Sequence, residues 1–248
     1  MSAKDTFRLL RQFILRHKLS KVKAIIPTSS STVIIAPHPD DETFGCAGLI
    51  CQKTLLNADL TVIFLTRGES SLSDISTDEI AFHRFNTAYR VCKKLGVRQI
   101  LCLNLTDGSI PNRGEFGYES ALRVLLEKLR DINPKEVFCT HDAEGWSDHT
   151  AAFELTYDTL RQMNSTADLY KYWVWVWFSV PLRNIKALNF DHTFRLSIDN
   201  VIHEKNIAIQ SYLKDQTSDG RPYCGILPNR FISAFKWPYE IFEKVDYQ

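Results

Sequence analysis

The sequence predicts a single α/β domain of the Rossmann-like, three-layer α/β/α kind, with a mostly parallel sheet between two layers of helices. Its 248 residues suit one domain, and 44% hydrophobic against 24% charged residues is the composition of a globular protein. Short apolar runs alternate with longer helical patterns through the first two-thirds of the chain. The short runs are almost continuously apolar, as strands covered on both faces must be.

Residues 1–31 are expected to form an amphipathic helix and a linker. Phe7, Leu10 and Ile14 recur at helical spacing, with basic residues between and after them (Arg8, Arg11, Arg16 and Lys18). Such a helix packs its apolar stripe on the domain or lies on an anionic membrane surface. The stretch has no signal-peptide core, and no segment reaches the roughly 18 apolar residues of a membrane span. We therefore expect a cytoplasmic protein, with peripheral contact at the inner face of the membrane left open.

Residues 32–222 are expected to form the main domain. Strands are predicted at 32–36, 60–66, 99–104 and 136–140, and helices near 43–57, 77–95, 118–131 and 149–163. Asp78 and Glu79 after Thr77 favour a helix start there, and Gly96 supplies the left-handed residue that ends this helix.

The pattern changes after residue 165. Trp173, Trp175 and Trp177 alternate with valines, which predicts a strand over 169–179. Its tryptophan face packs in the core, forms a contact in a homo-oligomer, or stacks a sugar. A strand near 193–198 and a helix near 201–214 follow, before turn-forming residues at 215–230. Residues 223–248 are expected as a surface tail packed on or beside the domain.

Charge, cysteine content and missing motifs exclude several classes of protein. The 30 Lys and Arg against 29 Asp and Glu leave a net charge of +1, which argues against nucleic acid as a partner. The six cysteines form no C-x-x-C pair and lie mostly in apolar runs, as buried thiols in a reducing compartment do. No G-x-S-x-G, P-loop or G-x-G-x-x-G string occurs, so serine hydrolases and nucleotide-binding loops have no support.

The string Pro37-His38-Pro39-Asp40-Asp41-Glu42 follows the first predicted strand. Parallel sheets bind ligands at the carboxyl ends of their strands, where an imidazole and adjacent carboxylates would be costly to bury without a cation. His38 and Asp41 can hold a divalent metal across the turn, which leaves Asp40 as a base for water. The alternative is a polar turn whose aspartates cap the next helix.

A second polar cluster follows the fourth predicted strand, over residues 140–149. Since this is again the carboxyl end of a strand, both clusters should face one crevice. His149 completes a His/Asp/His set with one position left for water, and Asp148 or another neighbour is expected to orient the ring. The sequence therefore predicts a catalytic metal rather than a structural one.

These strings resemble the two motifs of the PIG-L/LmbE-like deacetylases, zinc enzymes that remove N-acetyl groups from glucosamine-type sugars. The likeness rests on residues 37–42, followed by Gly45-Cys46-Ala47-Gly48, and on Asp148-His149-Thr150-Ala151. Weaker matches extend it over about residues 32–217. They are Leu65-Thr66-Arg67-Gly68-Glu69, Leu95-Gly96-Val97, Leu105-Thr106-Asp107-Gly108, and the late residues Lys205, Ala208 and Gln216.

The resemblance implies a role for each matched position. His38, Asp41 and His149 would bind Zn²⁺, with Fe²⁺ or another divalent transition metal left open, and Asp40 would be the general base. Arg84 and Asp107 would hold sugar hydroxyls, with Arg90 as the alternative arginine. A surface ion pair is the competing interpretation of either residue.

The chain departs from the family at the second motif. Many members carry a histidine, taken to stabilise the oxyanion or protonate the leaving amine, where this chain has Trp146. An indole N–H donates a hydrogen bond but delivers no proton at neutral pH, so Trp146 is a substrate contact. We expect His141 to supply the proton, with His83 as a more distant candidate, or Asp40 to return the proton it took from water.

The expected function is hydrolysis of an N-acetyl group from a glucosamine-type sugar or glycoconjugate, in cell-surface polysaccharide or glycolipid synthesis for example. One alternative is a non-catalytic carbohydrate-binding or scaffold protein that retains the fold and the metal site. Another is an amidase for an N-acyl substrate that is not a sugar.

Overall fold

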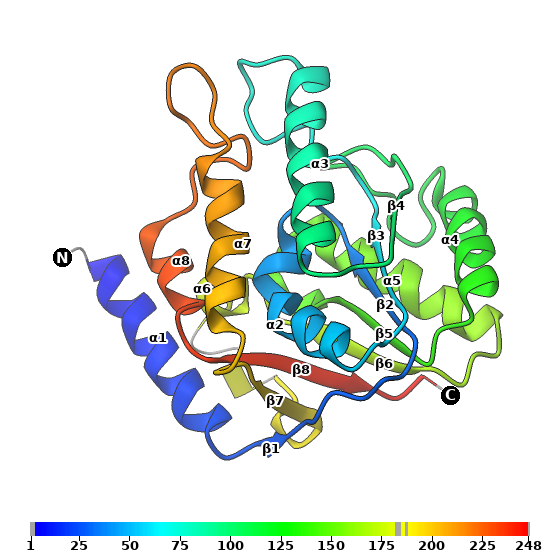
Figure 1. Ribbon diagram of the computed structural model, residues 1–248, viewed down its shortest axis with the longest axis horizontal. Helices are drawn as coiled ribbons and strands as arrows, with labels where there is room; N and C mark the ends of the chain where they lie inside the picture. Colours follow the sequence, from blue (N-terminus) through cyan, green and yellow to red (C-terminus); the bar gives the residue numbers. More distant parts are fainter. Residues whose placement is uncertain (1–2, 182–184, 187, 248) are drawn as a thin grey trace.

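The computed structural model describes residues 3–181, 185–186 and 188–247 (Figure 1). The strands are β1 Lys23–Ala24, β2 Thr32–Ala36, β3 Leu60–Phe64, β4 Gln99–Cys102, β5 Glu136–Thr140, β6 Asp168–Tyr172, β7 Thr193–Ser197 and β8 Tyr239–Val245. The α-helices are α1 Ala3–Leu19, α2 Asp41–Leu55, α3 Thr77–Lys94, α4 Tyr118–Ile132, α5 Ser147–Gln162, α6 Val176–Ser179, α7 Ile202–Lys214 and α8 Asn229–Ala234. Short 3₁₀ turns include Asp142–Glu144 and Phe190–His192.

Within the described residues the strands form one sheet in the order β1-β7-β8-β6-β5-β2-β3-β4. All neighbouring strands run parallel except β8, which is antiparallel to β6 and β7. Chain order reverses at β2, since β3 lies on one side of it and β5 on the other. Such a switch point opens a crevice at the carboxyl ends of the strands, which positions a site after β2 and β5.

The sheet is covered on both faces, which confirms the predicted three-layer fold. Along β2, Ile34 and Ala36 join a core cluster shared with α1, α2, α3 and α7. Val33 and Ile35 point the other way, into a second cluster shared with α4 and α5. This alternation explains why the strand reads as continuously apolar: each of its faces is buried.

The Trp-rich segment is the first departure from expectation, because the predicted strand over 169–179 is wrong beyond Tyr172. The chain leaves the sheet there, and residues 176–179 form α6. The backbone N–H groups of Val174, Trp175 and Val176 donate to one carboxylate oxygen of Glu144, which bends the chain away from the strand direction. Trp173 and Trp177 are buried in the core, so the tryptophans do not share an exposed face.

The C-terminal residues are the second departure, since the expected surface tail is instead part of the sheet. Strand β8 lies between β6 and β7, and α8 packs against α1 and α6. Two of the β8 carboxylates are buried and paired: Glu240 with Lys205, and Glu243 with His141 and Lys171. The partners of Glu240 and Glu243 lie elsewhere in the sequence. From its own residues alone, a strand with these glutamates is therefore predicted to be exposed.

Helix α1 lies on the core and not apart from it. Its residues Leu15 and Leu19 are fully buried, and the chain after it adds the short strand β1 beside β7. In the part of the chain that the structure describes, no helix combines the length and apolar character needed to cross a membrane.

Candidate active site

A cavity of about 590 Å³ opens at the carboxyl ends of β2 and β5. Both predicted polar clusters line it: His38 and Asp40 follow β2, and His149 stands in the first turn of α5. The loops after β3 and β4 and the segment 224–227 complete its wall. The topology of the sheet therefore brings together two motifs that are about 110 residues apart.

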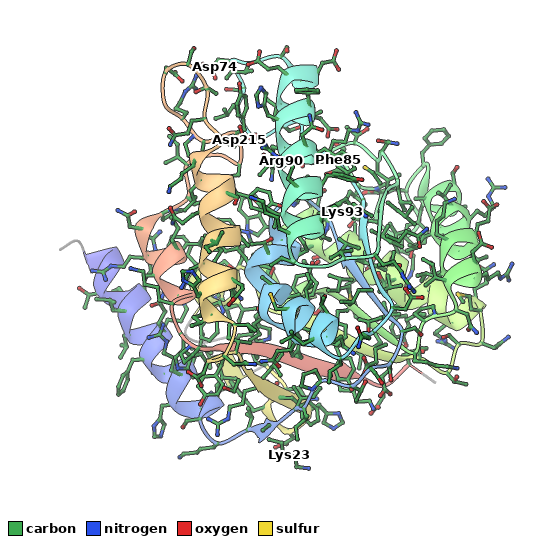
Figure 2. The ribbon with its side chains drawn as sticks, in the orientation of Figure 1. Lys23, Asp74, Phe85, Arg90, Lys93 and Asp215 are labelled. Carbon is green, nitrogen blue, oxygen red and sulfur yellow. The ribbon has the colours of Figure 1, made fainter. Side chains whose placement is uncertain are left out.

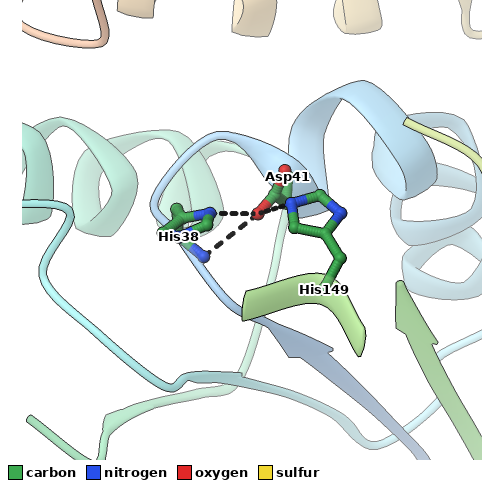
Figure 3. A group of neighbouring side chains, drawn as sticks. All are labelled: His38, Asp41 and His149. Atoms are coloured by element: carbon green, nitrogen blue, oxygen red, sulfur yellow. Dashed lines mark hydrogen bonds and ion pairs between the residues drawn. The ribbon is translucent and has the colours of Figure 1, made fainter. Parts of the chain in front are cut away.

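Three ligand-type atoms converge inside this cavity, from His38, Asp41 and His149 (Figure 3). Asp41 Oδ2 lies 3.1 Å from His38 Nδ1 and 3.5 Å from His149 Nε2. All three atoms lie within 4.8 Å of one another. Two imidazole nitrogens and one carboxylate oxygen form a donor set that suits Zn²⁺ and related divalent transition metals.

The far nitrogen of each imidazole faces a carboxylate. His149 Nδ1 lies 2.6 Å from Glu144 Oε2, and His38 Nε2 lies 3.0 Å from Asp148 Oδ2 and 3.1 Å from Asp107 Oδ1. A carboxylate that accepts the ring N–H fixes the tautomer and leaves the other nitrogen free to bind a metal. Both rings therefore present a ligand atom on the side of Asp41.

A second cation-binding geometry, formed by His38 with Asp107 and Asp148, is less suited to a metal. The Asp148 oxygens already accept the N–H groups of Gly108 and Ile110, and an Asp107 oxygen accepts that of Ser70. These carboxylates act as supports that hold the ring of His38.

Burial and close packing shift the pKa values of the cluster. Burial alone would lower the pKa of His38, but hydrogen bonds to Asp107, Asp148 and Asp41 outweigh it and raise this pKa well above its usual range. Burial would raise the pKa of Asp41, but His149 and His38 bring it below its ordinary value. The surrounding carboxylates thus stabilise positive charge at the two imidazoles, which is the charge that a bound cation would supply.

Asp40 is held beside these ligand-type atoms in a strained backbone conformation. Its φ is 122°, its N–H donates to Glu42 Oε2 at 3.0 Å, and its Oδ2 lies 3.2 Å from Arg84 Nη2. Burial raises the pKa of Asp40 to about 8, against the opposing effect of Arg84. A carboxyl group whose pKa lies near neutrality can both take and return a proton.

Arg84 lies in the cavity, whereas the alternative Arg90 does not. The Arg84 guanidinium is buried and donates to the carbonyl oxygens of Gly68 and Pro39, each at 2.8 Å, so it is no surface ion pair. Gly68 is required for this approach, because a Cβ there would come within 2.5 Å of the guanidinium. Figure 2 shows Arg90 on α3 beside Asp215, and its Nη2 donates to Thr87 in a separate hollow between α3 and α7.

Asp107 and Trp146 also line the cavity, at opposite depths. One Asp107 oxygen faces His38 and the other accepts the N–H of Ser70. Trp146 is 48% exposed at the rim, where its ring is tilted against Trp175 at a centroid distance of 5.2 Å. Their predicted contacts with substrate stay predictions, with Asp107 on the polar floor and Trp146 on the aromatic rim.

His141 requires a correction, because the structure places it outside the cavity. Its Nε2 lies 3.1 Å from Glu243 Oε2, and its Nδ1 accepts the N–H of Ala143. Both ring nitrogens are occupied in a buried cluster, so the geometry does not support the predicted role of His141 as a proton donor. His83 is also remote: it bonds Asp215 and stacks on Tyr223.

Glu144 is the residue that sequence reasoning missed. Its carboxylate is fully buried, with one oxygen on His149 and the other on three successive backbone N–H groups of the segment 174–176. The only sequence signal is its place five residues before His149. The segment 224–227 was missed as well, because it comes to the cavity from the C-terminal part of the chain.

Sequence comparison gives a matching family and relatives that include one protein from each of two Bacillus species. The model of the family described as PIG-L, GlcNAc-PI de-N-acetylase, matches residues 33–160, about half of the chain. The protein named probable N-acetyl-alpha-D-glucosaminyl L-malate deacetylase 2 of Bacillus subtilis is 26% identical over 129 residues, which are 49% of this chain and 57% of that protein. Its counterpart from Bacillus anthracis is 29% identical over 128 residues, 46% of this chain and 55% of that protein. The aligned part thus spans little more than half of these relatives.

Comparison with solved structures supports the fold. The N,N'-diacetylchitobiose deacetylase of Pyrococcus horikoshii superposes with a TM-score of 0.65 at 19% identity, covering 99% of this chain and 93% of that one. A zinc-inhibited form of the teicoplanin deacetylase Orf2 gives 0.64 at 12% identity, covering 88% and 99%. The 4-carboxy-2-hydroxymuconate hydratase GalB of Pseudomonas putida also gives 0.64, at 15% identity, covering 88% and 97%. Because a hydratase shares the fold, the function must be argued from the residues of the site.

Proposed function

Because the chain belongs to the PIG-L, GlcNAc-PI de-N-acetylase family, we propose that it hydrolyses the N-acetyl group of a glucosamine-type sugar or glycoconjugate to acetate and a free amine. One observation carries the proposal: a His/Asp/His donor set and a second aspartate, Asp40, stand together in one cavity. Such a set matches the requirements of amide hydrolysis, which needs an electrophile for the carbonyl and a base for water.

We propose His38, Asp41 and His149 as the ligands of a zinc ion, with Fe²⁺ or another divalent metal as the alternative. The donor atoms are of types that bind zinc, and all of them lie within 4.8 Å of one another. A carboxylate also contacts the other nitrogen of each imidazole, Glu144 at His149 and Asp148 at His38. When bound, such an ion polarises the amide carbonyl and acidifies water.

Asp40 is the proposed general base, and its surroundings suit that role. It takes a proton as the water oxygen bonds to the carbonyl carbon, and its contact with Arg84 orients the carboxylate. The C–N bond then breaks and the leaving nitrogen needs a proton. Since His141 is turned away, Asp40 itself is proposed to return that proton, with the Trp146 N–H as a hydrogen-bond donor at the rim.

The walls of the cavity support a sugar amide as substrate. Arg84 and Asp107 offer polar groups near the floor, where hydroxyls can be held, and Trp146 and Trp175 offer aromatic rings at one side. Sugars present hydroxyl groups at the edge and an apolar C–H face, so they match a site with both kinds of wall.

Metal removal tests this proposal. A chelator should lower the rate of amine release from N-acetylglucosamine conjugates at least about 100-fold, and added Zn²⁺ should restore it, because carbonyl polarisation is lost with the ion. Metal analysis of the purified protein is measured in parallel. Bound metal with release only from non-sugar N-acyl amides would indicate the amidase alternative, and bound metal with no release at all would indicate the scaffold.

Truncating Trp146 tests its contact with substrate. We expect Trp146→Ala to raise KM about fivefold to tenfold with little change in kcat, because an aromatic contact contributes about 1 kcal/mol. Trp146→Phe, which keeps a ring at the rim, serves as the control and should stay within about twofold. A large fall in kcat at unchanged KM would instead assign the indole N–H to the transition state.

Three expectations about the whole chain remain proposals. The first is the division of the chain into three parts, residues 1–31, 32–222 and 223–248. The last of these parts contributes β8 to the sheet. A cytoplasmic location is the second, and a homo-oligomer is the third. The buried state of Trp173 and Trp177 removes the tryptophan face that suggested a subunit contact.

A further inference from the structure

The N-terminal segment is the most cationic part of the chain. Residues 6–23 contain six lysines and arginines and no acidic residue, whereas the whole chain has a net charge of only +1. The remainder of the protein is therefore net acidic. Lys18 is exposed near the end of α1, Lys21 in the turn after it and Lys23 in β1, and together they extend this charge along one edge of the molecule.

The same helix exposes large apolar side chains that its packing does not require. Leu15 and Leu19 already bury the inner face of α1 in the core. On the outer face Phe7, Leu10 and Phe13 remain 58%, 46% and 71% exposed. These three residues follow one another at intervals of three, so they lie on neighbouring turns of one side of the helix.

A hollow of about 450 Å³ lies between α1 and residues 190–191. Phe13, Ile14 and Phe190 supply apolar lining. The polar rim consists of His17, Lys18, Lys21 and one acidic residue, Asp191, and Lys18 Nζ stands 5.0 Å from the centre of the Phe190 ring. The hollow thus combines an apolar interior with a rim on which the two lysines outnumber the one aspartate.

This surface lies at the edge of the fold and is linked to the cavity through α6. Figure 1 shows α1 beside α8, with α4 on the opposite side of the molecule. An Arg11 N–H donates to the carbonyl of Phe178, and the Phe178 ring meets Trp175 edge-on at 6.0 Å. Since Trp175 lines the cavity, the first half of α1 stands on the side of the cavity that carries the aromatic rim.

We propose that Phe7, Leu10, Phe13, Lys18, Lys21 and Lys23, the α1 surface, dock the protein on an anionic phospholipid bilayer. The apolar side chains enter the boundary between headgroups and acyl chains, and the lysines neutralise lipid phosphates. A second copy of the chain is a poorer occupant, because it brings the same excess of positive charge to the interface. The inference goes beyond the proposed function and does not depend on it.

Vesicle binding by the full chain tests this docking. The protein should co-sediment with vesicles of 70% phosphatidylcholine and 30% phosphatidylglycerol and stay in solution with pure phosphatidylcholine. Binding should weaken as salt rises from about 0.05 M to 0.5 M, because the Debye length shrinks well below 10 Å. Binding is measured without substrate, so failure here leaves the deacetylase proposal untouched, and a protein without activity can still bind.

Variants locate the surface. Lys18→Gln/Lys21→Gln/Lys23→Gln should weaken binding at least about 100-fold, since each lysine near an anionic surface contributes a factor of about 5. Phe7→Ser/Phe13→Ser should weaken it at every salt concentration. Controls are Phe116→Ser, a still more exposed phenylalanine in the loop before α4, and Arg123→Gln/Arg130→Gln on α4, which should bind as the wild type does.

Two results would overturn the proposal. One is binding that does not distinguish the two vesicle compositions or that the α1 variants leave unchanged. The other is a wild-type dimer in light scattering that Phe7→Ser/Phe13→Ser converts to a monomer while no vesicle binding occurs, which would assign the surface to self-association. Amine release from a soluble substrate should be unchanged in all of these variants.

Discussion

Asp40→Asn is expected to bind metal as the wild-type protein does and to release amine about 10³-fold more slowly. The substitution removes both proton transfers proposed for Asp40, from the water and to the leaving nitrogen, which the neighbouring groups cannot supply. The three ligand-type atoms belong to other residues, so the affinity for the metal should change little. The measurement is kcat with metal content determined on the same samples.

Asparagine is the right replacement because of the local backbone. A φ of 122° is tolerated far better by Asn or Asp than by alanine, and the amide oxygen can still accept from Arg84. The control is Asp142→Asn, a carboxylate that contacts Lys171 outside the cavity and should keep activity within about twofold. Wild-type activity in Asp40→Asn would remove Asp40 from the mechanism.

The His/Asp/His cluster could be predicted from sequence because its residues come after strands with a clear apolar pattern. Thr32–Ala36 and Glu136–Thr140 read as strands buried on both faces, and parallel strands align their carboxyl ends. His38 and His149 therefore had to face one crevice. The fold class followed from the same strands, since the alternation of strands and helices holds as far as α5.

The groups that could not be predicted are buried charges with remote partners. Glu240 accepts from Lys205 and from the backbone N–H groups of Gly48 and Leu49, so its strand is interior although its sequence is polar. The burial of His141 cannot be predicted for the same reason, because its partner Glu243 stands about 100 residues later. The hydrophobic pattern of a segment depends only on its own residues. Whether a charged residue of that segment can be buried depends on a partner that the fold brings from elsewhere in the chain.

Glu144→Gln is expected to weaken metal affinity about 100-fold. In the wild-type protein Glu144 accepts the N–H of His149 Nδ1, which leaves His149 Nε2 free to act as a ligand. In the variant the amide oxygen still satisfies the three backbone N–H groups of the segment 174–176, so the amide N–H₂ faces Nδ1. That contact favours the His149 tautomer whose proton is on Nε2. A protonated Nε2 has no lone pair for a metal, so the affinity for the metal falls.

The chain contains a matched control for this effect, since Glu243 and His141 form a second buried pair of the same chemistry outside the cavity. Glu243→Gln alters stability in a comparable way but should leave metal affinity unchanged. Zinc titration and thermal unfolding of both variants separate the two effects. Saturating zinc should restore most activity to Glu144→Gln, because Asp40 and the ligand atoms remain; equal metal affinities in the two variants would show that Glu144 does not act through His149.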